Sequence, residues 1–375
     1  MKFYEVADQL GGEDIWLRRI ASLYGQSPTL IWPRNQPPLI EPGSMWNTVL
    51  LRFSLLVEHV LPGVGRGLFL NFLFAFYKLN DNIIFLSTTY IPIPRGKQII
   101  AYIHTPSRAM TVDYESVIDS LSHKSLKYRL SLPILRFAYK VIYKFSLAHA
   151  NILLVNSLNV QKRVFDFVRV KAEICYPSQD TNSFYSQKSD SYFLLVSKIQ
   201  PYKGHDFCLR AFQIFCEHNS NFRLIIVSVT PTAKEDKEYF DKIKRFATEN
   251  TLPVEFLLDL DRKSVIDLYS RAYLCLFGSR NEDLGQVPIE AMASSKPVIS
   301  VKGPGPSETI IDNVTGFLVE SETQMAEKML FLVNNQSVAE AMGKKGRERA
   351  AEMFDDMRFK KCLDKHIEGI CHNEY

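Results

Sequence analysis

The chain has 375 residues, of which 46% are hydrophobic and 23% are charged, and its formal net charge is +4. This composition is typical of a globular protein and excludes a disordered chain, and the length suits two domains rather than one. None of the six cysteines forms a C-x-x-C pair, so the sequence predicts neither a zinc site nor a disulfide framework.

The location expected from these features is the cytoplasm. Scattered cysteines suit a reducing compartment, and the first residues lack the basic and then apolar order of a signal peptide. The longest clean apolar piece, "GLFLNFLFAFY", has 11 residues, whereas a membrane span needs about 20.

Three apolar runs in the first half predict parallel strands, and the run 125–150 predicts one or two basic amphipathic helices. The strands are expected at 82–88, 98–104 and 152–157. Residues 1–180 carry 20 Lys and Arg against 13 Asp and Glu, whereas residues 181–375 carry 25 against 28. A basic half beside a mildly acidic half indicates that the first half meets an anionic partner.

The segment 176–192 is rich in Ser, Asp, Asn and Gln and is the best linker candidate. Short apolar runs then alternate with amphipathic helical patterns, which predicts a doubly wound α/β sheet. The final stretch 347–370 also reads as helical. Strands are expected at 192–199, 222–229, 254–260, 273–279, 296–301 and 316–320, and helices at 206–218, 237–249, 264–272 and after Pro288.

Two glutamates eight positions apart mark the stretch "NEDLGQVPIEAM". Glu282 lies in the loop at the carboxyl end of a strand, where α/β folds bind ligands. Gly285 permits a tight turn, and Pro288 suits the first turn of a helix whose free N–H groups favour a phosphate. Glu290 could accept hydrogen bonds from two adjacent hydroxyls. The alternative is an ordinary capping glutamate and a surface glutamate.

Three other groups could bind a ligand at strand ends. Lys198 and Lys203 surround a strand–helix turn and could pair with a diphosphate, although two solvated lysines are an equally simple interpretation. His104 closes an apolar strand and could bond a ligand or move a proton, unless it is a satisfied core histidine. Gly11 and Gly12 precede a helical pattern and could bring backbone N–H groups to an anion, or simply form a turn.

Taken together, these motifs resemble the family-4 retaining glycosyltransferases of GT-B fold, closest to mannosyltransferases of polysaccharide or lipid-linked glycan assembly. "EDLGQVPIE" matches the family's E-x7-E signature, and "LLVSKIQPYKGHDFCLRAF", "YIHTPSR" and "GPSETI" match other segments. The resemblance covers nearly the whole chain and is strongest over 151–320. It implies two Rossmann-like doubly wound domains facing a cleft.

The resemblance also implies a domain plan. An acceptor-binding domain would span 1–180 and a nucleotide-sugar-binding domain 190–350. A C-terminal helix within 351–375 would cross back to the first domain.

Roles for individual residues follow from the same resemblance. Lys198, Lys203 and Gly285 would hold the donor diphosphate, and Glu290 the ribose. Glu282 and His104 would act on the donor sugar as the catalytic pair. The remaining members of the implied site are Asp283, Leu284 and Gln286 for the sugar, and Gly11 and Gly12 for the acceptor or phosphate.

The expected reaction moves a hexose, favoured to be mannose from GDP-mannose, to a glycan or polyprenyl-linked acceptor with retention of configuration. The nucleotide diphosphate sugar is a substrate, and no cofactor or metal is expected, because the "DLD" at 259–261 reads as a helix cap. An anionic membrane surface is a further expected partner, and nucleic acid is not. The alternatives are a sugar-nucleotide epimerase of GT-B fold and an inactive partner subunit of a glycosyltransferase complex.

Overall fold

The computed structural model describes residues 1–6, 12–30, 81–88, 93, 95–106 and 126–372. Contacts divide the chain into two units, which are described separately. The first comprises Met1–Tyr176 with Lys360–Tyr375, and the second comprises Pro177–Phe359. None of the described helices is both long and apolar enough to cross a bilayer.

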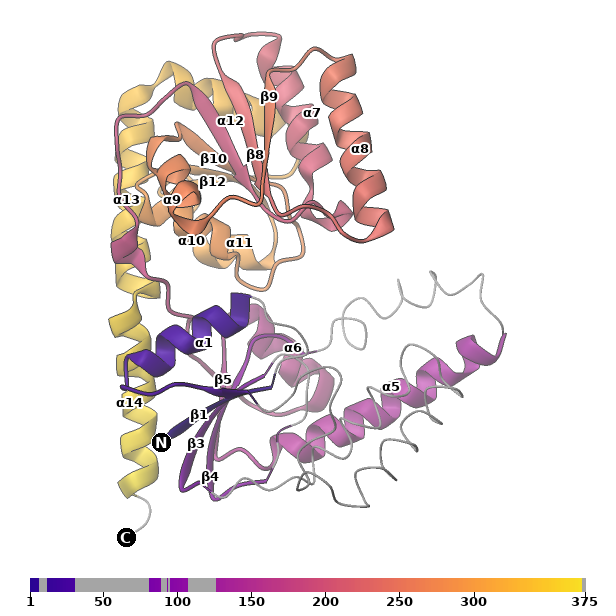
Figure 1. Cartoon of the computed structure of the whole chain (residues 1–375), viewed down its shortest axis with the longest axis vertical. Helices are drawn as coiled ribbons and strands as arrows, with labels where there is room; N and C mark the ends of the chain where they lie inside the picture. The colour runs from indigo at the N-terminus through magenta and orange to yellow at the C-terminus, as the bar shows by residue number, and fades with distance from the viewer. Residues whose placement is uncertain (7–11, 31–80, 89–92, 94, 107–125, 373–375) are drawn as a thin grey trace. The chain divides into compact units, whose positions relative to one another are not determined.

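The first unit is built on a six-stranded parallel sheet with the order β2-β1-β3-β4-β5-β6 (Figure 1). The predicted strands of this half are confirmed as β3, β4 and β5, and their buried residues form one apolar cluster. The described elements are β1 (Lys2–Val6), α1 (Gly12–Ser22), β2 (Thr29–Leu30), β3 (Ile83–Thr88), β4 (Gln98–Ile103), α5 (Leu126–Leu147), β5 (Ile152–Val155), α6 (Leu158–Val168), β6 (Glu173–Ile174) and, from Lys360 onward, α14 (Asp356–His372).

The second unit has a six-stranded parallel sheet with the order β12-β11-β10-β7-β8-β9. The predicted alternation of strands and helices is confirmed. Its elements are β7 (Tyr192–Val196), α7 (His205–Cys216), β8 (Arg223–Ser228), α8 (Lys234–Glu249), β9 (Val254–Leu258), α9 (Arg262–Arg271), β10 (Leu274–Phe277), α10 (Gln286–Ala293), β11 (Val298–Val301), α11 (Pro304–Thr309), β12 (Gly316–Val319), α12 (Glu322–Asn334) and α13 (Gln336–Phe354).

The strand order of the second sheet fixes where a ligand can bind. The chain starts in the middle of the sheet at β7, moves outward through β8 and β9, and then crosses to β10 on the other side of β7. Chain connections leave β7 and β10 in opposite directions, which opens a crevice beyond the carboxyl ends of these two neighbours.

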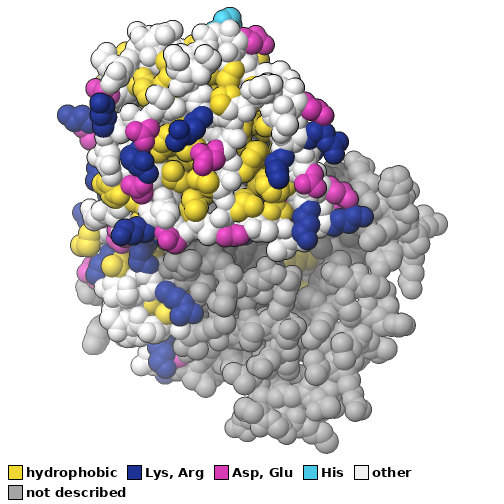
Figure 2. Space-filling model, turned by 45° about the horizontal axis from the view of Figure 1, so that its top comes forward, with side chains coloured by type: hydrophobic (Ala, Val, Ile, Leu, Met, Phe, Trp, Pro, Cys, Tyr) yellow, Lys and Arg dark blue, Asp and Glu magenta, His cyan; other side chains and the backbone are white. Residues whose placement is uncertain are grey.

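On the face drawn in Figure 2, basic and acidic side chains are interspersed over the coloured residues, so the described part of this face carries no broad field of one sign.

The ends of the second unit lie beside each other. The backbone N–H of Gln179 donates to the carbonyl of Phe354 at 2.6 Å, and the Thr181 hydroxyl donates to Asp355 at 2.7 Å. The stretch 347–370, which the sequence predicts as helical throughout, is broken at Asp355, where ψ is 154° and α13 gives way to α14. Asp355 thus ends one helix and binds the segment that enters the unit.

A contact between two glycine backbones closes the crevice at its base. Gly204, between the short 3₁₀ turn η3 (Pro201–Lys203) and α7, has φ of 71°, and a Cβ added there would collide with the carbonyl oxygen of Gly278. A Cβ on Gly278 would in turn collide with the carbonyl oxygen of Gly204. Only paired glycines allow the turn after β7 to touch the strand end of β10.

We expect Gly204→Ala to lower the free energy of unfolding of the second unit by about 2–4 kcal/mol, because it adds both left-handed strain and a backbone collision. Gly25→Ala is the control, since Gly25 has φ of 65° but open space around it, and should cost only about 1 kcal/mol. Urea unfolding followed by circular dichroism measures both. Equal losses of unfolding free energy in the two variants would contradict the prediction, because they would show that the contact between the added Cβ and the Gly278 carbonyl is relieved without cost.

The first residue of α7 is a buried histidine. His205 is fully buried, its Nε2 lies 2.9 Å from the Ser197 hydroxyl, and burial lowers its pKa to about 4. The unfolded chain therefore takes up a proton below pH 6.5, whereas the folded chain does so only near pH 4. Stability is consequently lost as the pH falls through this window.

We expect acidification from pH 7 to pH 4 to remove up to about 3 kcal/mol of stability through this single group. The His205→Gln variant should lose that part of the pH dependence, and the exposed His218→Gln variant should keep it. Unfolding in urea at several pH values provides the measurement. If the free energy of unfolding of His205→Gln depends on pH as that of the parent protein does, the pH dependence comes from carboxylates alone.

Candidate functional site

The centre of the candidate site is an ion pair between the two connections that the glycine contact holds together. Lys203 ends the turn after β7, and Glu282 lies in the loop after β10. The Lys203 ammonium and a Glu282 carboxylate oxygen are 2.5 Å apart, and the two side chains are 20% and 21% exposed. The structure therefore brings together two residues that the sequence placed in separate motifs 79 positions apart.

The loop that carries Glu282 is held by its own backbone. The N–H of Gly305 donates to the carbonyl of Glu282 at 3.1 Å, and a Cβ on Gly305 would press on the backbone of Glu282 and Leu284. Leu284 is buried, whereas Asp283 is half-buried. The start of α11 thus fixes the path of the loop, so that a ligand would meet a rigid backbone.

Gly285 ends this loop and caps α10 with φ of 89°. Gln286, the first residue of the helix, is exposed. The first N–H groups of α10 therefore have no partner within the helix and carry its positive dipole, as the sequence predicted for a phosphate site.

Glu290 lies one turn into α10 and is held by a residue that the sequence reasoning missed. The Arg262 guanidinium is 2.8 Å from a Glu290 oxygen and lies over the ring of Phe184 at 5.1 Å, and the Glu290 side chain is only 11% exposed. Burial, followed by the Glu290 charge, raises the pKa of nearby Tyr269 well above its usual value. No signal in the sequence pointed to Arg262, because a basic residue at the start of a helix has no distinctive spacing.

Lys198 is placed differently from Lys203. It follows β7 by two residues and is exposed to solvent, and no ion pair joins it to another described residue. Its position beside the crevice leaves its ammonium available to a ligand, whereas Lys203 is already engaged.

His104 belongs to the first unit, where it follows β4. Its Nε2 lies 2.9 Å from the Ser87 hydroxyl, and its ring meets Trp16 and Tyr102 edge-on at 4.9 and 5.0 Å. Gly12 is the first residue of α1, the same helix that carries Trp16, so the histidine strand and this helix are in contact. Gly11 lies outside the described residues.

The acidic and sulfur-containing side chains of the described residues do not gather into a metal site. Among them, no group of three or more His, Cys, Asp or Glu could hold an ion. Asp261 caps α9 by accepting from the Ser264 N–H at 2.7 Å, and Asp259 binds Thr230. The structural interpretation of the "DLD" stretch is therefore confirmed.

The second unit is similar in sequence to known glycosyltransferases. Residues 178–349 match the family described as "Glycosyl transferases group 1". An uncharacterized glycosyltransferase of Methanocaldococcus jannaschii is 28% identical over 60% of this chain and 65% of its own length. The alpha-1,3/1,6-mannosyltransferase ALG2 of Homo sapiens is 27% identical over 73% of this chain and 68% of its own.

Among solved structures, a sucrose-phosphate synthase from Thermosynechococcus elongatus superimposes with a TM-score of 0.68 at 17% identity, over the full length of both chains. At that identity the likeness shows the fold alone. Residues 178–349 thus match a group 1 glycosyltransferase domain, and the chain has the GT-B fold of its structural neighbours.

Proposed function

We propose that this protein transfers mannose from GDP-mannose to a hydroxyl of a lipid-linked or polysaccharide acceptor, with retention of the anomeric configuration. The observation that carries the proposal is the Lys203–Glu282 ion pair at the carboxyl ends of β7 and β10. A cation and a carboxylate at this point match the two halves of a sugar nucleotide, an anionic diphosphate and a polyhydroxylated sugar.

Donor binding would exchange one partner of this ion pair for another. In the structure Lys203 is neutralised by Glu282. An arriving diphosphate takes the ammonium, and the freed carboxylate can accept hydrogen bonds from sugar hydroxyls. The exchange pairs the ammonium with an anion and gives the carboxylate hydrogen-bond donors, so neither half-buried charge loses all of its partners.

The chemical step breaks the bond between the anomeric carbon and the diphosphate oxygen and forms a bond to the acceptor oxygen. Negative charge builds on the leaving diphosphate, where Lys203, exposed Lys198 and the N-terminus of α10 can stabilise it. The acceptor proton passes to the leaving phosphate, so no basic side chain is required. His104 of the first unit is proposed to bond the donor sugar.

Glu290 is proposed to bind the ribose. Its carboxylate is fixed by Arg262 through one oxygen, and we expect it to accept hydrogen bonds from the ribose diol. Mannose is favoured over glucose and N-acetylglucosamine because the human relative, which matches 73% of this chain, is a mannosyltransferase.

The acceptor side of the proposal includes an anionic membrane surface. Along α5 the exposed apolar side chains Phe137, Val141 and Phe145, which are 68%, 52% and 45% exposed, recur every four residues and so share one side of the helix. Arg136, Lys140 and Lys144 each precede one of them. An apolar stripe flanked by cations fits the surface of a bilayer that contains anionic lipids.

The central test is transfer by Lys203→Met. We expect about a hundredfold or greater loss of labelled mannose transfer from GDP-mannose, because one charged contact to the leaving group is removed. Lys302→Met is the matched control, since Lys302 pairs with exposed Glu320 in the same unit. Transfer within about threefold of the parent protein would remove Lys203 from the mechanism.

Running the same assay without acceptor separates the rival functions. A transferase leaves the donor largely intact, whereas an epimerase of the same fold converts it to an altered sugar or free nucleotide. An inactive partner subunit would give no product under either condition.

For membrane association, we expect the full-length protein to float with vesicles of mixed phosphatidylcholine and phosphatidylglycerol, and to release as salt is raised. The double variant Phe137→Ser/Phe145→Ser should bind at least about tenfold more weakly, because two apolar groups no longer enter the interface. Phe165→Ser removes an exposed phenylalanine from α6 and serves as control. Equal binding to uncharged vesicles, or no effect of the double variant, would contradict this surface.

A further inference from the structure

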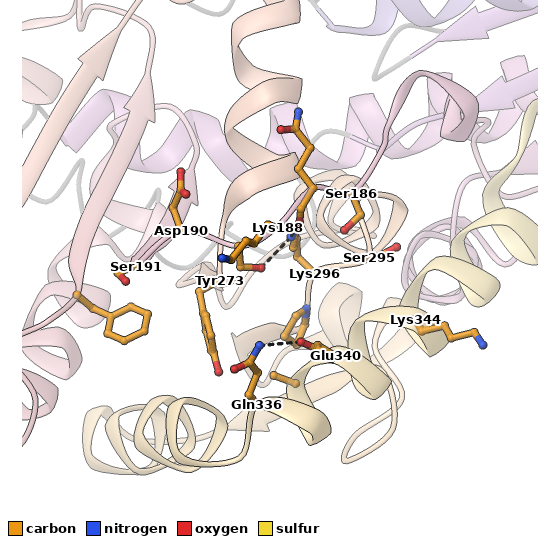
Figure 3. Close-up of a pocket in the computed structure, with 15 residues that line it drawn as sticks. Ser186, Lys188, Asp190, Ser191, Tyr273, Ser295, Lys296, Gln336, Glu340 and Lys344 are labelled. Atoms are coloured by element: carbon orange, nitrogen blue, oxygen red, sulfur yellow. Dashed lines mark hydrogen bonds between the residues drawn. The ribbon is translucent and has the colours of Figure 1, made fainter.

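The second unit has a cavity that the proposed reaction does not use. Its volume is about 480 Å³, within the usual range of small-molecule pockets. It lies where β7, β10 and β11 begin, and it is walled by the segment that precedes β7 and by α13 (Figure 3). The five residues of β7 separate it by roughly 16 Å from the strand ends that carry the ion pair.

A buried lysine lines this cavity. Lys296 is 3% exposed, and its ammonium donates to the Gln187 carbonyl at 3.2 Å and to the Ser189 hydroxyl at 3.1 Å. Both acceptors are neutral. Within the described chain no carboxylate forms an ion pair with Lys296, and burial lowers its pKa.

The two acidic residues of the cavity are engaged elsewhere. Asp190 pairs with Arg271 at 3.4 Å, and Glu340 accepts from the Gln336 amide at 2.8 Å. A buried charge is costly unless a counter-charge lies next to it. The charges of Asp190 and Glu340 act on Lys296 from a distance, but among the described residues no carboxylate lies at ion-pair distance from its ammonium. The cavity thus holds a buried cation with no anionic group in direct contact.

Hydroxyl groups and a second lysine complete the lining. Ser186, Ser191 and Ser295 contribute hydroxyls, and Lys188 and Lys344 also line the cavity, with the Lys344 side chain extending away from Lys296 in Figure 3. Ammonium and hydroxyl donors converging on one space suit the several acceptor oxygens of a phosphate group better than the two of a carboxylate.

We infer that this cavity binds the phosphate group of a small phosphorylated metabolite, with the Lys296 ammonium as its buried counter-charge and Lys188 at its rim. The site is separate from the proposed donor site, since it lies at the opposite edge of the same sheet. A ligand in this cavity would contact both the segment 186–191 and α13, and so would bridge them.

The inference is tested by isothermal titration of the full chain with inorganic phosphate and with mannose 6-phosphate, at constant ionic strength. The variant Lys203→Met removes one of the two cations of the proposed donor site and should weaken phosphate binding there, so binding that it leaves unchanged belongs to another place. We expect binding to persist in Lys203→Met and to weaken by about tenfold to a hundredfold in Lys296→Met. A tighter response to mannose 6-phosphate than to inorganic phosphate would identify a sugar phosphate rather than free phosphate as the occupant.

Binding that Lys296→Met leaves unchanged, or no binding to the parent protein, overturns the inference. Binding lost in Lys203→Met but kept in Lys296→Met also overturns it and assigns the phosphate to the donor site. Should Lys296→Met fail to fold, the exposed rim variant Lys188→Ser decides, and it must weaken binding severalfold. The Lys302→Met protein is the matched control and should bind as the parent does.

Discussion

The arrangement of the second unit depends on the approach of two backbones without side chains. Gly204 and Gly278 let the connection after β7 touch the end of β10, and this approach places an ammonium and a carboxylate from distant parts of the chain within hydrogen-bonding distance. A larger residue at either position would hold the two connections apart. The ion pair in the crevice therefore forms only because no side chain keeps the two connections apart at its base.

The ion pair lets the crevice hold two charged groups that are largely shielded from water. Two half-buried charges that neutralise each other avoid the cost of an isolated buried ion, and each could pair instead with a ligand group of opposite charge. Rigid surroundings support this exchange, because the start of α11 fixes the loop of Glu282 and Arg262 fixes Glu290. Preorganised donors of this kind stabilise developing charge without having to rearrange at the moment of reaction.

Much of the fold could be predicted from the sequence, because buried parallel strands are continuous apolar runs and the helices between them are strongly patterned. The E-x7-E stretch, Lys203 and His104 were predicted as site residues because each follows the end of such a strand, and their roles stay predictions. Arg262 was missed since its role comes from packing on Phe184, which no local pattern encodes. The break at Asp355 was also missed, because the residues on both sides favour helix and the break is set by hydrogen bonds to Thr181.

The adjacency of Gln179 and Phe354 has a topological meaning. The second unit is a continuous segment whose entry and exit are paired, so in terms of connectivity it is an insert carried by the rest of the chain. Segments with neighbouring ends can be excised, exchanged or circularly permuted without threading the chain anew. This organisation would let the second unit be replaced between related proteins while the rest of the chain stays intact.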